Sequence, residues 1–170
     1  MAKRIPKKKN LKELILFLVR FNLLLIPFYL IIYFDISFYP LQILLASFIA
    51  KFLNFLRFDV KAASFFVYLG KSNFPIDISR DCTGWKSVYS ISALTFATKK
   101  GRLKDKLKFL SLAIPFFLLM NFFRITSTII LGFYLGFRYI DLIHNTWQFL
   151  VVFLILFVWW LWLKKINSKE

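Results

Sequence analysis

Residues 144–163, HNTWQFLVVFLILFVWWLWL, decide the fold of this chain. The stretch is apolar after Gln148, and three tryptophans stand near its end, just before Lys164-Lys165. A helix of about 20 apolar residues crosses the roughly 30 Å hydrocarbon core of a bilayer. Tryptophan collects at membrane interfaces, and lysine favours the cytoplasmic side. The stretch therefore predicts a helix that spans the membrane and ends at the cytoplasm.

The composition of the whole chain agrees with a membrane protein. Of its 170 residues, 59% are hydrophobic and 21% are aromatic, and the mean hydropathy is +0.67. Soluble domains are about 45–50% apolar because they need a polar exterior. The net charge of +16 lies in clusters between the apolar runs, which indicates positive-inside topology rather than nucleic-acid binding. No nucleic-acid partner is therefore expected.

The chain has one cysteine and one histidine. A single cysteine excludes an internal disulfide, a CxxC redox pair and a cysteine-rich zinc site. One histidine and no HExxH motif leave no recognisable set of metal ligands. We therefore expect neither a metal nor a cofactor.

Three further segments are predicted to span the membrane as helices. Residues 14–34 follow a basic cytoplasmic tail, residues 1–13, and are too long for the apolar part of a signal peptide. We expect them to form a retained anchor with a kink at Pro27. Residues 82–98 are shorter and more polar, so other helices should shield them. Residues 107–135 are long enough to cross and protrude.

One apolar segment, residues 41–58, is ambiguous. The polar residues in and after it approximate a stripe along a helix: Ser47, Lys51, Asn54 and Asp59. Such a helix either lies in the membrane interface or forms a fifth span. Residues 59–80 read as short extended pieces around a turn at residues 70–73. The prediction is one domain, residues 1–170: an all-α integral membrane protein of four to five transmembrane helices with a short extended external segment.

The distribution of charge predicts the orientation in the cell membrane. Sixteen of the 24 Lys and Arg residues fall in the N-terminal tail and first span, in the loop 99–108, or in the C-terminal tail. Five of the eight acidic residues fall in the segments 35–84 and 136–143. Because cytoplasmic loops are enriched in Lys and Arg, both termini of this multi-pass protein are expected in the cytoplasm. Four spans with an in-plane helix at 41–58 satisfy this arrangement.

Three residues from separate segments are predicted to reach the same depth, near the external side of the membrane. They are Cys82, Arg124 and His144. At about 1.5 Å of rise per residue, they lie roughly 24–30 Å from the basic residues at the inner ends of their helices. Two of them are the only cysteine and the only histidine of the chain, and an arginine inside an apolar helix is costly enough to suggest a function. This coincidence predicts a site.

Each of the three residues also has a structural alternative. Cys82 could be a small apolar side chain, Arg124 could extend to the interface, and His144 could cap the last helix. The neighbouring residues favour a site: a helix cap at Ser79 or Asp81, space beside the sulfur at Gly84, and Asn121 one turn before Arg124. Together the three residues supply a nucleophile, a cation that stabilises a thiolate or an oxyanion, and a proton carrier.

These residues resemble the exosortase/archaeosortase family of membrane cysteine transpeptidases, over about residues 45–160. The resemblance rests on three short motifs in the order of the family: Asp81-Cys82-Thr83-Gly84 opening a helix, Asn121-x-x-Arg124 in the next helix, and His144 opening the last. The chain is shorter than many members, and Thr83 stands where Ser is common.

The resemblance implies an outward-facing site with Cys82 as nucleophile, Arg124 as stabiliser of the thiolate or oxyanion, and His144 as general acid and base. The supporting residues would be Asp81, Thr83, Gly84 and Asn121. Similar enzymes cleave surface proteins whose C-terminal signal consists of a short motif, a membrane helix and a basic tail. They join the new carboxyl terminus to an acceptor, which is a membrane lipid in archaeal examples.

Two other functions are open at the level of sequence. A non-enzymatic membrane scaffold or assembly subunit would bind anionic lipid through its basic surfaces, and its Cys82, Arg124 and His144 would contact different neighbours. A thiol acyltransferase would use the same nucleophile with a different acyl donor. The relative positions of the three side chains distinguish the scaffold from the enzymes.

Overall fold

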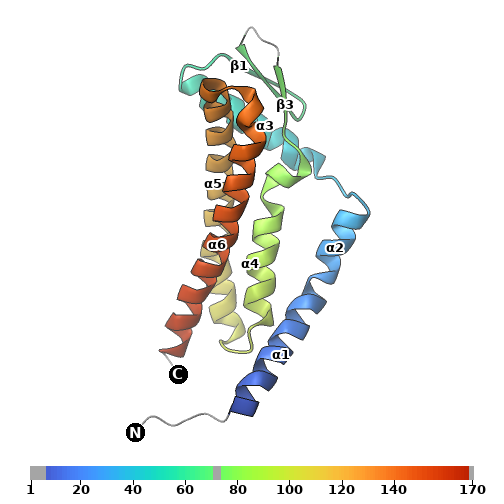
Figure 1. The fold of residues 1–170 in the computed structure, drawn as a ribbon, viewed down its shortest axis with the longest axis vertical. Coiled ribbons are helices and arrows are strands. Elements are labelled where there is room, and N and C mark those ends of the chain that lie inside the picture. Colours follow the sequence, from blue (N-terminus) through green and yellow to red (C-terminus); the bar gives the residue numbers. More distant parts are fainter. Residues whose placement is uncertain (1–6, 71–73, 169–170) are drawn as a thin grey trace.

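The computed structural model describes residues 7–70 and 74–168 and is predominantly helical (Figure 1). Its α-helices in chain order are α1 (Lys7–Leu24), α2 (Ile26–Tyr33), α3 (Tyr39–Phe55), α4 (Trp85–Ala97), α5 (Leu103–Leu135) and α6 (Ile140–Asn167). Its strands are β1 (Val60–Ala63), β2 (Phe66–Leu69) and β3 (Phe74–Asp77), and its short 3₁₀ turns are η2 (Arg80–Thr83) and η3 (Phe137–Tyr139). The strands lie at one end of the molecule, and the start of α1 and the end of α6 lie at the other (Figure 1).

Three segments of the described chain are long and apolar enough to cross a bilayer: Leu11–Tyr33, Leu103–Leu135 and Ile140–Asn167. Many of their large apolar side chains are exposed, as in surfaces that contact a membrane. The prediction of a helical membrane protein is therefore confirmed. By contrast, α4 has 13 residues and is only about 20 Å long, so the number of spans stays a prediction.

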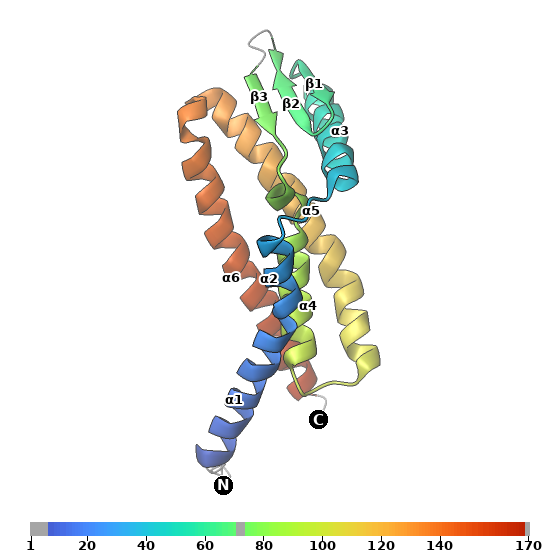
Figure 2. The same ribbon diagram turned by 90° about the vertical axis from the view of Figure 1, so that its right-hand side faces the viewer.

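Helix α4 lies between other helices, and α1, α5 and α6 pack against it (Figures 1 and 2). Its Ile91 is buried in a cluster with Phe117 of α5 and Ile155 of α6. Small residues of α4, Ala93 and Ala97, are also buried and allow close approach of neighbouring helices. The short and polar helix is thus covered by its neighbours, as its sequence predicts.

The N-terminal apolar segment consists of two helices. Helices α1 and α2 meet at Leu25, and Pro27 lies in the first turn of α2. Proline lacks a backbone donor and crowds the preceding turn, so it is favoured where a helix begins. The kink predicted at Pro27 thus takes the form of a break at Leu25. Helix α1 contacts the bundle through Phe17, whose ring stacks on Trp159 of α6 with 5.5 Å between centroids.

A three-stranded antiparallel sheet in the order β1-β2-β3 covers the end of the molecule remote from the termini (Figures 1 and 2). Helix α3 runs obliquely across the same end and packs on the sheet and on α5. The contacts bury one apolar cluster: Ala46, Ile49, Leu53, Val60, Val67, Ile78, Ile125 and Ile129. The predicted extended pieces at residues 59–80 are confirmed. The turn predicted at 70–73 falls between β2 and β3, and residues 71–73 lie outside the described chain.

The two edges of the sheet differ. On the β1 side, Asn54 of α3 donates from Nδ2 to the carbonyl of Val60 at 2.7 Å and accepts a hydrogen bond from its N–H at 3.0 Å. The Asn54 side chain therefore pairs with the outward backbone groups of Val60, as a neighbouring strand would. The opposite edge is β3, which leads directly into η2. The polar stripe that made residues 41–58 ambiguous thus contacts the sheet through Asn54.

Candidate active site

Cys82 lies in η2, the short turn between β3 and α4. Its backbone N–H donates to the carbonyl of Ser79 at 2.9 Å, and Thr83 Oγ1 donates to the carbonyl of Arg80 at 2.8 Å. Gly84 then adopts φ +80° and ψ 0°, in the left-handed region that favours glycine. This conformation separates η2 from α4.

The prediction that Ser79 or Asp81 caps the helix after this turn is wrong. Neither Ser79 nor Asp81 caps α4, because Gly84 is the residue before that helix and no side-chain cap hydrogen bond is present. Within the span predicted at residues 82–98, the α-helix begins at Trp85, because a residue in the left-handed conformation interrupts a helix. The thiol of Cys82 therefore belongs to the turn before α4 and not to the first turn of the helix.

The Ser79 hydroxyl contacts the sulfur instead. Ser79 Oγ donates to Cys82 Sγ at 3.5 Å. The Cys82 side chain is half-buried, which is the degree of exposure typical of reactive cysteines. Sequence reasoning considered Ser79 only as a helix cap; its position three residues before the cysteine is the signal that could have indicated this contact.

Helix α5 holds η2 through two side chains that lie one helical turn apart. Asn121 Nδ2 donates to the carbonyl of Cys82 at 2.6 Å, and Arg124 Nη2 donates to the carbonyl of Asp81 at 3.3 Å. Both α5 residues are buried. The structure therefore brings two of the predicted motifs together, although they are about 40 residues apart in the sequence.

Gly84 allows α5 to approach this closely. A Cβ atom at residue 84 would lie 3.0 Å from Cγ of Asn121 and 3.1 Å from its Nδ2. Real Cβ atoms seldom have such close neighbours, because packed interiors leave no room for them. The space predicted at Gly84 is thus filled by Asn121, the same side chain that binds the Cys82 carbonyl.

Arg124 supplies a buried cation beside the turn. Arg124 is only 8% exposed, and its Nε has no hydrogen-bond partner among the described residues. It lies within electrostatic range of Cys82 and Asp81. A charge inside an apolar helix is costly, and buried donors are rarely left unpaired. Such a guanidinium can stabilise negative charge on a sulfur or on a substrate oxygen.

His144 lies in the second turn of α6 and is half-buried. It is within electrostatic range of Arg124, Asp141 and Asp81. In the described part of the chain, no hydrogen bond joins its ring to Cys82 or Arg124. Cys82 and Arg124 are thus linked by the hydrogen bonds between α5 and η2. His144 lies on another helix, α6, and interacts with Arg124 only electrostatically.

The alternative that His144 caps the last helix is wrong. Helix α6 begins at Ile140, and Tyr139 is the residue that precedes it. Helix α6 therefore begins one turn before residue 144, where the predicted span opens. The reason is that the sequence before His144, with Leu142 and Ile143, continues the helical pattern.

A network of charges ties η2 to its neighbours. Asp81 Oδ2 accepts a hydrogen bond from Lys86 Nζ at 2.7 Å, and Asp81 Oδ1 lies 3.6 Å from Arg80 Nε. Arg80 Nη1 also donates to Asp35 Oδ1 at 2.8 Å, beyond the end of α2. Burial by itself raises the pKa of Asp81, but the hydrogen bond and charge of Lys86 and then the charge of Arg80 lower it below the ordinary value. Asp81 is therefore ionised at neutral pH.

Sequence reasoning missed Arg80 and Lys86. Both residues lie within five positions of Cys82 in the sequence, so their charges were visible, but their partners depend on the turn. Among the described residues, no group of three or more His, Cys, Asp or Glu side chains could hold a metal ion.

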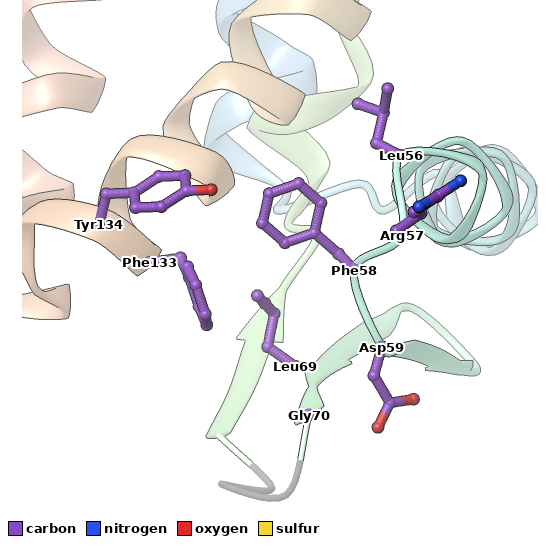
Figure 3. A pocket seen from close by; sticks show the side chains of 8 residues that line it. All are labelled: Leu56, Arg57, Phe58, Asp59, Leu69, Gly70, Phe133 and Tyr134. Atoms are coloured by element: carbon purple, nitrogen blue, oxygen red, sulfur yellow. The ribbon is translucent and has the colours of Figure 1, made fainter.

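A pocket of about 350 Å³ lies between the end of α3, the end of β2 and the end of α5 (Figure 3). The side chains of Phe58, Leu69, Phe133 and Tyr134 turn toward one another, whereas the Asp59 carboxylate points away from them (Figure 3). Cys82 does not line this pocket. The candidate site is therefore the surface at η2 and not this cavity.

The fold and the site together define a polytopic helical membrane protein with a thiol held beside a buried arginine. The chain belongs to the transmembrane exosortase family, because the family model described as Transmembrane exosortase (Exosortase_EpsH) matches residues 10–161. No curated protein and no solved structure matches the chain.

Family membership gives the general role of the chain. Exosortases are membrane cysteine transpeptidases that act on surface proteins bearing sorting signals, so the chain is a membrane protein with a transpeptidase or sorting role of this general kind. This result favours the enzyme over the non-enzymatic scaffold and over a thiol acyltransferase. It also confirms the resemblance drawn from the three short motifs.

Proposed function

We propose that this chain cleaves the C-terminal sorting signal of surface proteins and transfers the new carboxyl terminus to an acceptor, a membrane lipid. The observation that carries the proposal is the hydrogen bonding of α5 to η2, in which Asn121 binds the Cys82 carbonyl and Arg124 binds the Asp81 carbonyl. These bonds hold the only cysteine of the chain beside a buried guanidinium. Cys82 is the nucleophile, Arg124 stabilises negative charge, and His144 transfers protons.

The first half of the reaction forms a thioester. The Cys82 thiol gives its proton to the His144 imidazole, and the thiolate attacks the carbonyl carbon of the scissile peptide bond. Arg124 stabilises the resulting oxyanion. The C–N bond then breaks, and the imidazolium of His144 gives its proton to the leaving amine. Catalytic hydrogen bonds often form only with substrate bound, so the separation of His144 from Cys82 is compatible with this step.

The second half transfers the acyl group. A hydroxyl or amine of the acceptor loses its proton to neutral His144 and attacks the thioester carbonyl. The C–S bond breaks, and Cys82 leaves as a thiolate that takes the proton back from His144. Atoms and electrons balance without a cofactor.

The site faces the outside of the cell, and both termini face the cytoplasm. Support for this orientation comes from the basic segments: the start of α1, the loop between α4 and α5 and the end of α6 all lie at the end of the molecule opposite η2 (Figure 1). Cytoplasmic segments are enriched in Lys and Arg. An acceptor lipid would therefore come from the outer leaflet.

The segment to be cleaved lies as an added strand along the outer edge of β3, where Asp77 supplies the outward backbone N–H because Pro75 has none. The backbone N–H of Ile78 donates to Phe65, and Ile76 pairs with Val67. Because backbone groups alternate in direction along a strand, the N–H and C=O of Asp77 point away from β2. At the opposite edge, the outward backbone groups of Val60 in β1 are already bound by Asn54. A peptide bound at β3 would lead toward Cys82, five residues farther along the chain.

The proposal is tested by trapping the acylated enzyme from cells that contain its substrates. Because the chain has one cysteine, any hydroxylamine-labile peptide attached to it must be linked to Cys82. We expect mass spectrometry to find such a peptide, derived from a surface protein with a membrane helix and a basic tail. Cys82→Ala should yield no adduct and leave the substrate uncleaved. Normal processing by Cys82→Ala would overturn the assignment of the nucleophile.

Binding at β3 has its own test. Asp77→Pro removes the outward N–H, and Asp77→Asn is the matched control because it retains that donor. We expect the proline variant to need several times more substrate for the same rate, with little change in the maximal rate. Equal behaviour of the two variants would rule out strand addition and leave the thioester mechanism untouched.

A further inference from the structure

A groove of about 660 Å³ lies at the basic end of the bundle, far from η2. It runs between the first turns of α5 and the last turns of α6 and includes the loop before α5. The residues that line it are Gly101, Arg102, Asp105, Lys108, Phe109, Leu112, Val158, Leu161, Trp162, Lys165 and Ile166. The proposed transpeptidase reaction uses none of them.

The two walls of the groove are matching helical stripes. On α5 the lining residues follow the spacing of one helix face from Asp105 to Leu112, and on α6 they do so from Val158 to Ile166. The charged residues stand at the cytoplasmic end of each stripe. Leu112 lies about 6 Å deeper than Lys108 along α5, and Val158 lies about 10 Å deeper than Lys165 along α6. The groove thus changes from basic to apolar with depth.

Side chains of α5, α6 and the loop before α5 pack against one another to form the base of the groove. The rings of Phe109 and Trp162 stack with 4.9 Å between centroids. A Cβ atom at Gly101 would lie 2.9 Å from Cδ1 of Ile166, so the loop lies directly on α6. Lys100 reinforces this contact by donating to Asn167 Oδ1 at 2.8 Å.

The rim of the groove carries an excess of positive charge. Arg102, Lys108 and Lys165 line it together with one acidic residue, Asp105. No salt bridge in the described chain joins any of the three cations to a carboxylate. Leu112 is 70% exposed and Leu161 is 45% exposed, so the apolar part is open to the surrounding bilayer.

We propose that this groove binds an anionic phospholipid of the cytoplasmic leaflet. The phosphate lies among Arg102, Lys108 and Lys165, and an acyl chain follows the apolar part of the groove past Leu112 and Leu161. Basic pockets between helices on the cytoplasmic side of a membrane suit anionic headgroups. A soluble anion would use the rim alone, whereas a phospholipid matches both the charge and the apolar depth. The proposal requires the membrane orientation given above but not the chemistry of Cys82.

The test uses the full chain purified in detergent, with phosphatidylglycerol as the probe and phosphatidylcholine as the uncharged comparison. Native mass spectrometry measures how much lipid stays bound, and thermal unfolding measures the stabilisation. The test variant is Arg102→Gln/Lys108→Gln/Lys165→Gln. The control, Lys99→Gln/Lys104→Gln/Lys164→Gln, removes the same charge from the same segments but touches no lining residue.

We expect wild type and the control to retain phosphatidylglycerol in preference to phosphatidylcholine, and the test variant to bind it at least about tenfold more weakly. Equal losses in both variants would mean nonspecific attraction to the basic end and would overturn the site. Inorganic phosphate is the third probe; if it stabilises wild type as well as the lipid does, the ligand is a soluble anion. If the triple variant fails to fold, Lys108→Gln alone should weaken binding about threefold, and an unchanged affinity would refute the proposal.

Discussion

The two sides of the candidate site are built differently. On one side, Cys82 and Arg124 are connected through hydrogen bonds between η2 and α5, and Arg124 is buried. On the other side, His144 is half-buried on α6 and has no hydrogen bond to either residue within the described chain. Cys82 and Arg124, the proposed nucleophile and cation, thus belong to one hydrogen-bonded unit of η2 and α5, whereas the position of His144, the proposed proton carrier, depends on how α6 packs.

The residues around the two sides also differ in burial. Ile125 and Ile129 of α5 are buried beneath the sheet and α3. Phe149 and Phe153 of α6, just beyond His144, are 71% and 69% exposed. The half of α6 that contains Phe149 and Phe153 therefore offers an apolar surface to lipid or to another membrane helix. The comparison predicts that changes on the α5 side affect folding and activity together, whereas changes at His144 affect activity alone.

The largest effect is expected for His144→Gln. Loss of general acid–base catalysis should slow processing about 10²–10⁴-fold, while the unfolding temperature should stay that of wild type because the described chain makes no hydrogen bond to the ring. The measurements are the processing rate of the trapped substrate and thermal unfolding in detergent. Asn145→Ala is the control, since this exposed neighbour should leave both unchanged. A lower unfolding temperature of His144→Gln would show that His144 also stabilises the fold and would contradict the difference drawn between the two sides.

Arg124→Lys should reduce processing about 10²–10³-fold, the typical loss for removal of one oxyanion donor. A lysine keeps the charge but not the planar fork that reaches the Asp81 carbonyl. Unlike the histidine variant, it should also lower the unfolding temperature. Arg138→Lys, on an exposed residue, is the matched control. Wild-type stability together with lost activity would mean that the α5 side is no more preorganised than the α6 side.

Gly84→Ala tests the close approach of α5. The new Cβ would meet Asn121 at 3.0 Å, and a left-handed alanine costs about 1–2 kcal/mol. We expect lower stability and a severalfold slower reaction, because the Asn121 bond to Cys82 must shift. Gly70→Ala provides the control: φ is also positive there, at +52°, but no atom lies within 4 Å of the new Cβ. Similar behaviour of both variants would assign the effect to backbone strain alone.

The smallest effect concerns Asp81 and pH. Its pKa is lowered in the folded chain, so its ion pairs stabilise the fold above the ordinary pKa of aspartate, and that contribution is lost as pH falls through the lower folded value. The unfolding temperature of wild type should exceed that of Asp81→Asn slightly at pH 6–8, and the two should converge below about pH 4. Because the Asp81 side chain is 40% exposed, the effect is under about 1 kcal/mol. A difference that grows in acid would contradict the assignment.

The fold class could be predicted from the sequence because length and hydropathy are local properties of a segment. Residues 140–167 and 103–135 are apolar for long enough to cross a bilayer whatever their partners are. The spacing of Asn121 and Arg124 likewise predicts a shared helix face without any tertiary information. The short extended pieces before Cys82 could be recognised for the same reason.

The partners of these residues could not be predicted. Gly84 adopts a left-handed conformation immediately before α4, and Asn121 of α5 packs closely against it. Asn54 binds the backbone of Val60 in β1, a contact that depends on how α3 packs on the sheet. The contact of Ser79 with the thiol, and those of Arg80 and Lys86 with the Asp81 carboxylate, likewise depend on the turn of η2.

The sequence by itself therefore determined that this is a helical membrane protein, because bilayer insertion depends on the summed hydrophobicity of each segment, and it supplied the candidate residues for the chemistry. Only the tertiary structure decided that Asn121 and Arg124 bind the backbone of the turn that carries Cys82, while His144 stands on another helix, and that a basic groove opens between α5 and α6. Hydrogen bonds and cavities between distant segments depend on how helices pack, and no single segment contains that information.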